Sequence, residues 1–233
     1  MKCLIAVVSC HDRECYADAI RSTWLPLVPT EVDVRFFRGR GATRKPLVDE
    51  VWLDCQDDYA SLPEKVQSIF KWAVNHGYDF VMKLDDDSIL RPSAWLNSGF
   101  EAYDFTGNTI LSEKQKGPYV PYGFAYILCR KAMTYVVSAP LPQGNNDEDW
   151  VARTLYGHGI SLHVDHRYFL HMGRKKNAVR TGPRPLRVFD RPMEREAHSN
   201  TFCWNIFLNW EGFHCTPTEE IIKEYYKVWE RVK

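Results

Sequence analysis

The sequence FVMKLDDDSIL, residues 80–90, places three adjacent carboxylates directly after an apolar run. Asp85, Asp86 and Asp87 repel one another, and Lys83 is the one positively charged side chain in the stretch. The apolar run predicts a buried strand, and the acidic triplet lies just past its carboxyl end. Such a triplet is either a solvated acidic turn or a site for a divalent ion, and the three carboxylates alone leave both interpretations open.

The chain before residue 90 alternates between strand and helix patterns. Strands are expected at 3–9, 32–37, 51–55 and 78–84. The first of them is a continuous apolar run, which is typical of a strand covered on both faces. Strands that alternate with helices predict an α/β domain with a mostly parallel central sheet flanked by helices. Ligands of such sheets bind at the carboxyl ends of the strands, where the acidic triplet falls.

The two helices in this half have clear end signals. The first is expected at 12–24, with Asp12 as its N-cap and an apolar face at Tyr16, Ile20 and Trp24. The second begins at Ser61, which forms the S-x-x-E pattern of a capping box with Glu64. Gly77 is a natural left-handed stop for that helix.

In the second half of the chain, strand and helix patterns alternate less regularly. Its expected elements are a helix at 93–103, an apolar stretch at 124–129, helices at 130–138 and from 146–147, a strand at 161–166, and a closing amphipathic helix at 216–232. No internal repeat or low-complexity tract interrupts them. We therefore expect a single domain over residues 1–233.

Composition is that of an ordinary globular protein. The 233 residues are 45% apolar and 26% charged, and Lys plus Arg equals Asp plus Glu at 30 each, so overall charge predicts no partner. Seven cysteines without a CxxC pair favour reduced thiols. The start resembles a buried strand more than a signal peptide, and no run approaches the ~18–20 apolar residues of a membrane span. These features predict a cytoplasmic protein.

Positive charge gathers in one segment, residues 173–191. It contains seven basic residues and one acidic residue, which leaves a local net charge of +6. The basic residues are Arg174, Lys175, Lys176, Arg180, Arg184, Arg187 and Arg191. Because the segment has Gly and Pro and no periodicity, it is expected to be a loop.

A carboxylate cluster at a strand end suits Mn²⁺ or Mg²⁺. These hard ions take oxygen ligands and also bind diphosphate oxygens. Such an ion stabilises the charge that develops on a departing nucleoside diphosphate.

Further sequence blocks accompany the triplet in a recognisable order. They are AIRSTW at 19–24, DDYASLPEK at 57–65, KLDDD at 83–87, YVPYGFAY at 119–126, DEDW at 147–150 and HMG at 171–173. Together they resemble the family 31 glycosyltransferases, the β-1,3-galactosyl- and N-acetylglucosaminyltransferases and the Fringe enzymes. The resemblance implies a GT-A fold, a UDP-sugar donor, a divalent ion and inversion at the anomeric carbon. It also implies a donor-binding half over about 1–110 and an acceptor half over about 111–233.

The resemblance assigns metal and ribose contacts by position. Asp87 would ligate the metal and His171 would be the second protein ligand. Asp85 and Asp86 would hold the ribose and support the metal site. His163, His166 and His198 are rival candidates to His171.

The remaining assignments concern the base and the nucleotide. Asp149 would be the general base that takes the proton from the acceptor hydroxyl. Arg21 would lie near the nucleotide, and Ser9 and Lys83 are placed with the nucleotide-binding residues. The alternatives need no function: Asp149 interacts favourably with the dipole at the start of its helix, and Arg21 is a surface charge.

Several positions depart from the family pattern. YVPYGFAY is shorter than the family block, with Ala125 in place of a glycine, Ser61 stands for an asparagine, and Trp150 stands for a valine. These changes leave the donated hexose and the acceptor wall open. Cys10, His11 and Cys15 have poor spacing for zinc.

The basic segment suggests an anionic acceptor. It follows His171 directly, so it should border the active site, and its charge exceeds what one diphosphate requires. DNA that carries a hydroxymethylated base is a leading candidate, with contacts from Arg174, Lys175, Lys176 and Arg180. Phosphorylated or lipid-linked glycans fit as well. The alternatives are a β-1,3-hexosyltransferase for ordinary glycans and a metal-dependent phosphoesterase or nuclease; a non-catalytic binding module is less favoured.

Overall fold

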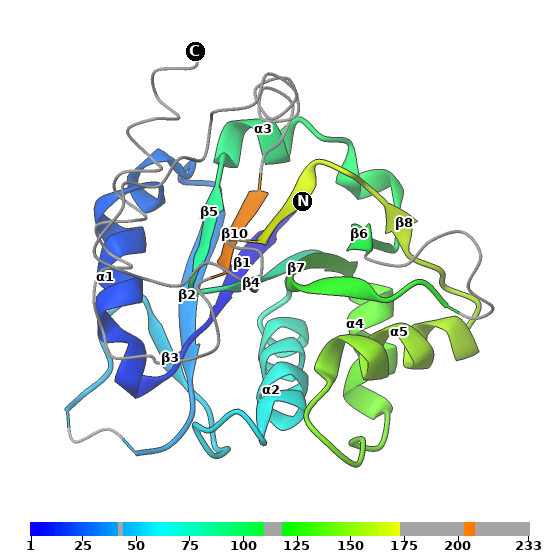
Figure 1. Cartoon of the computed structure of the whole chain (residues 1–233), viewed down its shortest axis with the longest axis horizontal. Coiled ribbons are helices and arrows are strands. Elements are labelled where there is room, and N and C mark those ends of the chain that lie inside the picture. Colours follow the sequence, from blue (N-terminus) through cyan, green and yellow to red (C-terminus); the bar gives the residue numbers. More distant parts are fainter. Residues whose placement is uncertain (42–43, 110–117, 173–202, 208–233) are drawn as a thin grey trace, which may run out of the picture.

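The computed structural model describes residues 1–41, 44–109, 118–172 and 203–207. A seven-stranded sheet has the order β3-β2-β1-β4-β7-β6-β8, and a three-stranded sheet has the order β5-β10-β9 (Figure 1). The strands of the large sheet are β1 (Cys3–Val8), β2 (Val32–Arg38), β3 (Glu50–Trp52), β4 (Phe80–Asp85), β6 (Phe105–Thr109), β7 (Pro121–Cys129) and β8 (His163–Val164). The small sheet contains β5 (Ser88–Leu90), β9 (Tyr168–Met172) and β10 (Cys203–Phe207).

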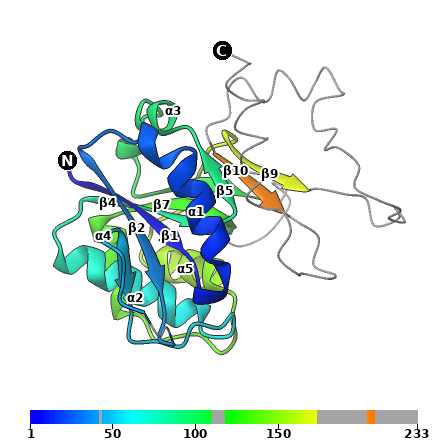
Figure 2. The same ribbon diagram turned by 90° about the vertical axis from the view of Figure 1, so that its left-hand side faces the viewer.

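The large sheet is mostly parallel. Strands β1 to β4 run in one direction, while β7 is antiparallel to both β4 and β6. The expected α/β class with a mostly parallel sheet is confirmed. In the small sheet, β10 pairs antiparallel with β5 and parallel with β9. Figure 2 shows the small sheet beside the large one.

Strand β1 lies at the centre of the core because all six of its residues are buried. Cys3, Ile5 and Val7 pack on the side of helix α1 (Glu14–Ser22). Leu4, Ala6 and Val8 pack on the opposite side with helices α2 (Leu62–Asn75), α4 (Arg130–Ser138) and α5 (Asp147–Gly157). Helices on both faces explain why the strand is apolar at every position rather than at alternate ones.

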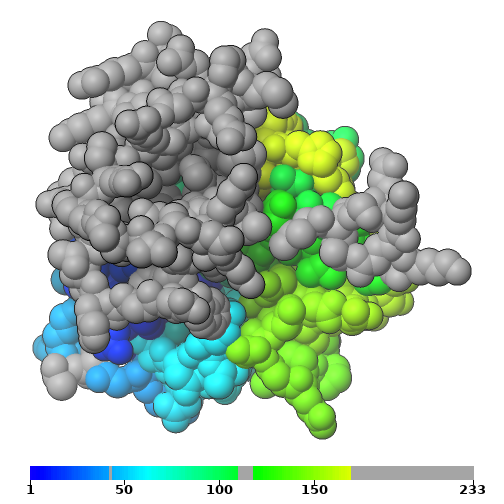
Figure 3. Space-filling view, viewed as in Figure 1, coloured from blue at the N-terminus to red at the C-terminus, as the bar shows by residue number. Residues whose placement is uncertain are grey.

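Helices α2, α4 and α5 form one layer against the large sheet. Helix α2 contacts both α4 and α5, and their surfaces adjoin in the cyan and green parts of Figure 3. The helix expected at 130–138 is confirmed, as is the helix expected from 146–147, where Asn146 is the N-cap and accepts a hydrogen bond from the Asp149 backbone at 2.8 Å. No helix among the described residues is both long and apolar enough to cross a membrane.

The first helix has other bounds than the prediction. The segment expected to start an α-helix at Asp12 is a 3₁₀ turn, η1 (His11–Arg13), and α1 ends at Ser22. Trp24 lies beyond the helix, yet it is fully buried and its indole donates to the Ser88 carbonyl at 3.1 Å. Trp24 is therefore a core residue, as its periodic spacing predicted, although it lies outside the helix.

The expected capping box at Ser61 is wrong. Ser61 occupies the N-cap position but its side chain makes no capping hydrogen bond, because its backbone (φ −90°, ψ 12°) is not in the extended conformation that a cap needs. Its backbone N–H donates instead to Asp58 at 2.8 Å. The stop at Gly77 is confirmed by a φ of 78°.

Several other boundaries also differ. The helix expected at 93–103 is divided into α3 (Pro92–Leu96) and a 3₁₀ turn, η3 (Phe100–Ala102), since Gly99 between them has a φ of 80°. A third 3₁₀ turn, η2 (Leu25–Leu27), follows α1. The strand expected at 161–166 is reduced to β8. The basic segment 173–191 and the helix expected at 216–232 lie outside the described residues.

Candidate active site

The acidic triplet lies where the two sheets meet. Asp85 is the last residue of β4, and Asp86 and Asp87 form the turn that leads into β5. Because β4 pairs with β1 on one side and β7 on the other, this turn is at the carboxyl end of a central strand. The predicted position of the triplet is confirmed; its role as a ligand stays a prediction.

Asp86 is the most buried member of the triplet. Its side chain has no exposed surface, and its carboxylate is contacted by the Arg13 guanidinium and by a hydrogen bond from the Ser9 side chain. Burial, with the Asp87 carboxylate adding to it, raises the pKa of Asp86 to about 7 against the opposing effect of Arg13. A buried carboxyl group with a raised pKa stays ionised at neutral pH only when a cation lies close by.

Arg13 provides that positive charge, which no sequence pattern indicated. Its guanidinium lies 3.0 Å from an Asp86 oxygen and 3.2 Å from an Asp87 oxygen. Arg13 is the last residue of η1, and the guanidinium also lies over the Tyr16 ring, 4.1 Å from its centroid. The acidic turn is therefore already paired with a protein cation.

The third carboxylate, Asp85, pairs with a different cation. Lys83 is buried in β4, and its ammonium lies 2.5 Å from Asp85 and donates to the carbonyl of Gly123 in β7. Burial by itself would lower the pKa of Lys83, but the carboxylates of Asp85 and Asp147 outweigh it and raise the pKa. Lys83 thus connects the end of β4 to β7 and to the start of α5.

Helix α5 turns its first two acidic residues toward this cation. Asp147 is buried beside Tyr126, whose hydroxyl is 3.5 Å away, and burial raises the pKa of Asp147 to about 8 although Lys83 opposes the shift. The Glu148 carboxylate lies so close to Gly123 that a Cβ there would be 2.8 Å from Oε1. Both side chains were missed as site residues; the acidic start of the helix was the available signal.

Asp149 has different surroundings. Its carboxylate accepts a hydrogen bond from Arg153, one turn along the helix, at 2.7 Å. It lines a hollow of about 360 Å³ that the loop at 142–146 forms with Trp150 and Thr154. Residues 147, 148 and 149 are about 100° apart around the helix, which separates their directions. The role of Asp149 as a base stays a prediction.

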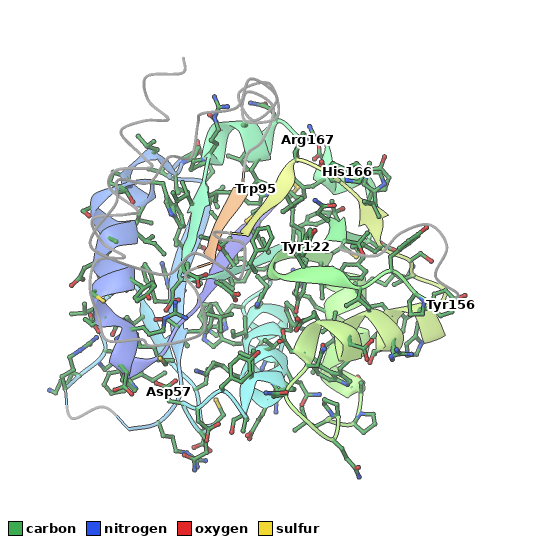
Figure 4. The ribbon with its side chains drawn as sticks, viewed as in Figure 1. Asp57, Trp95, Tyr122, Tyr156, His166 and Arg167 are labelled. Atoms are coloured by element: carbon green, nitrogen blue, oxygen red, sulfur yellow. The ribbon has the colours of Figure 1, made fainter. Side chains whose placement is uncertain are left out.

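A second polar network lies beyond the carboxyl ends of β1 and β2. Asp57, labelled in Figure 4, accepts hydrogen bonds from the backbone of His11 at 2.7 Å and of Gly39 at 2.5 Å. Lys65 is buried and donates to Asp57 at 2.6 Å and to the Ser9 carbonyl at 3.0 Å. Ser9, expected beside the nucleotide, therefore lies at the same end of the sheet as the acidic turn.

Gly39 allows this network to close. A Cβ at that position would lie 2.6 Å from the Gln56 carbonyl oxygen and 2.8 Å from the Asp57 nitrogen. The two chain segments touch through their backbones, so the Asp57 carboxylate is held against Gly39. This contact joins residues far apart in the sequence and could not be predicted from local pattern.

Arg21 is surrounded by carboxylates of the protein. Its guanidinium forms ion pairs at 2.9–3.3 Å, and the partners are Glu14, Asp18, Asp49 and Glu50. Glu50 also pairs with Arg44 at 2.7 Å and lies 3.5 Å from the buried Arg38. These contacts explain Arg21 as part of an ionic cluster, and its place near a nucleotide stays a prediction.

His171 belongs to the small sheet. It pairs with Ile206 in β10, and the preceding residue of β10, Asn205, pairs with Ser88 in β5. The backbone of His171 is therefore about two strand spacings, roughly 10 Å, from the residue that follows Asp87. The side chain of His171 lies outside the described part of the structure, as do His198 and the four expected acceptor contacts at 174, 175, 176 and 180.

The rival histidines have other neighbours. His163 stacks on Tyr103 with ring centroids 3.4 Å apart, and His166 lies 3.1 Å from the Asn108 side chain. Among the described residues, no group of three or more His, Cys, Asp or Glu side chains is arranged to hold a metal ion. A divalent ion at the acidic turn would thus have Asp86 and Asp87 as described donors. That set fits Mg²⁺ or Mn²⁺, which commonly bind one or two carboxylates together with water and substrate phosphates.

No family model and no curated protein matches the chain. Among solved structures, glycosyltransferase GlyE of Streptococcus pneumoniae TIGR4 is similar with a TM-score of 0.53 and 9% identity, over 98% of this chain and 61% of that one. Galactosyltransferase LgtC, solved with donor and acceptor sugar analogues, gives 0.49 and 12% over 99% and 100%. A protein of Desulfovibrio desulfuricans G20 described as a nucleotide-diphospho-sugar transferase gives 0.47 and 11% over 69% and 78%.

The similarity to GlyE concerns the fold. The chain has the α/β architecture that the resemblance implied, the GT-A fold. At 9% identity this likeness carries no information on substrate, and membership of family 31 stays a prediction.

Proposed function

We propose that the protein is a metal-dependent inverting glycosyltransferase that moves a hexose from a UDP-sugar to an acceptor hydroxyl. The observation that carries the proposal is the acidic turn at the carboxyl end of β4, with the fully buried carboxylate of Asp86 beside that of Asp87, in a GT-A fold. Ligands of open α/β sheets bind at this end of the strands. The fold of GlyE supports the same reaction class, by analogy only.

Asp86 and Asp87 would hold Mn²⁺ or Mg²⁺, with His171 as a third protein donor. When bound, the ion would stabilise negative charge on the departing diphosphate. Asp85 is held by Lys83 and is proposed to contact the ribose, while Ser9 and Lys83 border the nucleotide. The two cations at the site, Arg13 and Lys83, would favour the ionised forms of the acidic residues and hold their side chains in place before the donor arrives.

The general base is proposed to lie in the first turn of α5. The family resemblance favours Asp149, whereas the contact of Glu148 with Gly123, next to Lys83, favours Glu148 as the residue that faces the acidic turn. An inverting transfer needs one carboxylate to take the acceptor proton. The variants Glu148→Gln and Asp149→Asn, compared under identical conditions, distinguish the two: the base variant should lose about 10²-fold or more in kcat, and the other should keep activity within about tenfold.

The acceptor is proposed to be anionic. The support is the net charge of +6 in residues 173–191, which follow the candidate ligand His171 in the chain. DNA with a hydroxymethylated base is the first acceptor to test. A phosphorylated or lipid-linked glycan is the second.

A donor-hydrolysis screen tests the proposal directly. UDP-glucose, UDP-galactose and UDP-N-acetylglucosamine are incubated with the protein and Mn²⁺, with and without hydroxymethylcytosine DNA. We expect Mn²⁺-dependent release of UDP from one donor, abolished in Asp87→Ala. Absence of hydrolysis with every donor, together with cleavage of a phosphodiester substrate, would overturn the proposal in favour of a nuclease. Transfer to a neutral sugar and none to DNA would overturn the anionic acceptor alone.

A further inference from the structure

Arg13 occupies the acidic turn where the proposed function requires a divalent ion. We infer that Arg13 is a built-in competitor of that ion: its guanidinium pairs with Asp86 and Asp87 in the free protein and leaves them when the ion binds. This inference rests on the proposed function, because it assigns a regulatory contact to the same site. It predicts that the protein binds its metal more weakly than two free carboxylates at this position would.

The contacts of Arg13 fit a removable partner. The guanidinium reaches both carboxylates, at 3.0 and 3.2 Å, although the Arg13 side chain remains 37% exposed. Asp86, by contrast, has no exposed surface and Asp87 has 22%. Two adjacent carboxylates with this burial need positive charge beside them whenever both are ionised. Arg13 supplies it in the free protein, and its own exposure leaves it a path toward solvent.

The Arg13 guanidinium also has other contacts available once it leaves the carboxylates. Its guanidinium already lies over the Tyr16 ring, which supports a cation without a carboxylate. Its backbone is at the junction between η1 and α1, with φ −113° and ψ 34°, outside the regular helical conformation. A guanidinium released here can pair with the diphosphate of a bound donor, since Arg binds phosphate oxygens through two parallel hydrogen bonds.

Simultaneous occupancy is unfavourable for two reasons. The carboxylate oxygens that accept the guanidinium are those that an inner-sphere metal ion would use. A guanidinium next to a divalent ion also repels it, and Arg cannot relieve the repulsion by losing its proton. Binding of the ion therefore requires the Arg13 side chain to leave the two carboxylates.

Mn²⁺ titration monitored by the EPR signal of the free ion tests the inference without relying on activity. The variants are Arg13→Ala, the double variant Asp86→Asn with Asp87→Asn, and Arg130→Ala as a charge-matched control. Arg130 pairs with Asp79 just before β4, about 20 Å from its carboxyl end. We expect Arg13→Ala to bind Mn²⁺ about tenfold tighter or more than wild type, Arg130→Ala to match wild type, and the double variant to lose the site.

Labelling of the wild-type protein guards against a misfolded variant. Phenylglyoxal modification, read by peptide mass spectrometry, should increase at Arg13 when Mn²⁺ is added and stay unchanged at Arg130. Equal or weaker Mn²⁺ binding by a folded Arg13→Ala, or labelling of Arg13 that Mn²⁺ leaves unchanged, overturns the inference while the metal site stands. If wild type and Arg13→Ala both bind no Mn²⁺, the metal-dependent function and the inference fail together.

Discussion

Replacement of Lys83 by methionine removes the cation at the centre of the candidate site with little change in volume. The Lys83 side chain is 1% exposed, and its ammonium lies 2.5 Å from Asp85 and donates to the Gly123 carbonyl. Asp147 also contributes to its raised pKa. The substitution therefore removes the cation that Asp85 and the half-buried Gly123 carbonyl contact and that lies near Asp147.

The magnitude follows from how each partner responds. Breaking a buried ion pair costs roughly 3–5 kcal/mol when the remaining charge stays buried and unpaired. Asp85 is 33% exposed, so water can solvate it in part, and Asp147, whose pKa is about 8, is already largely protonated at pH 7. The largest remaining cost is the Gly123 carbonyl, which loses a charged donor worth roughly 1.5–3 kcal/mol. We expect the free energy of unfolding to fall by about 2–4 kcal/mol at pH 7.

Urea unfolding at pH 7, followed by far-UV circular dichroism, measures the change. Lys71→Met on the exposed face of α2 is the matched control and should alter stability by less than about 0.5 kcal/mol. The double variant with Asp85→Asn should show a coupling of about 0.5–3 kcal/mol with Lys83→Met. A loss below about 1 kcal/mol in Lys83→Met, with no coupling to Asp85, would refute the view that Lys83 holds the end of β4 to β7.

Two further predictions concern stability. The pKa of Asp147 is raised from its ordinary 3.8 to about 8 in the folded protein, so the stability it contributes is present below about pH 4 and is lost as the pH rises toward 8. The urea midpoint of wild type should therefore fall relative to that of Asp147→Asn between pH 4 and pH 8. Midpoints that stay parallel over this range would contradict the raised pKa. Gly39→Ala should lower the free energy of unfolding by about 1–3 kcal/mol because its Cβ would meet backbone atoms of residues 56 and 57. Gly157→Ala is the control, since a Cβ there meets open space, and it should be neutral or stabilising. Equal effects of the two variants in thermal unfolding would show that the Gly39 contact is not tight.

The apolar runs of the sequence were reliable guides to the large sheet. Strand β1 is buried on both faces and is an unbroken apolar run in the sequence, while the strand before the acidic triplet is apolar from Phe80 to Leu84 except for the buried Lys83. The helices at 130–138 and from 147 also lie where the sequence predicted them, and each begins with a local capping hydrogen bond, to Cys129 and to Asn146. The short strands β5 and β6 were missed, because three residues give no period and FTGNT is not an apolar run.

Some residues of the candidate site could likewise be placed from the sequence, and others could not. The acidic triplet, Ser9 and Lys83 could be placed from sequence because they lie within or directly after apolar strands. The contacts of Arg13 with Asp87 and of Asp57 with His11 could not, since each joins residues more than 45 positions apart in the chain.

The sequence by itself determined that an acidic turn follows a buried central strand of an α/β sheet, because strand burial is written in consecutive residues. The tertiary structure decided which cations pair with that turn and which carboxylates of α5 face it. Those contacts depend on how η1 packs against the end of β4 and on the rotation of α5 about its axis, and a rotation of one residue changes direction by about 100°. No local pattern encodes either quantity, so the pairing of Arg13 with Asp86 and the direction of Glu148 emerge only when the chain is folded.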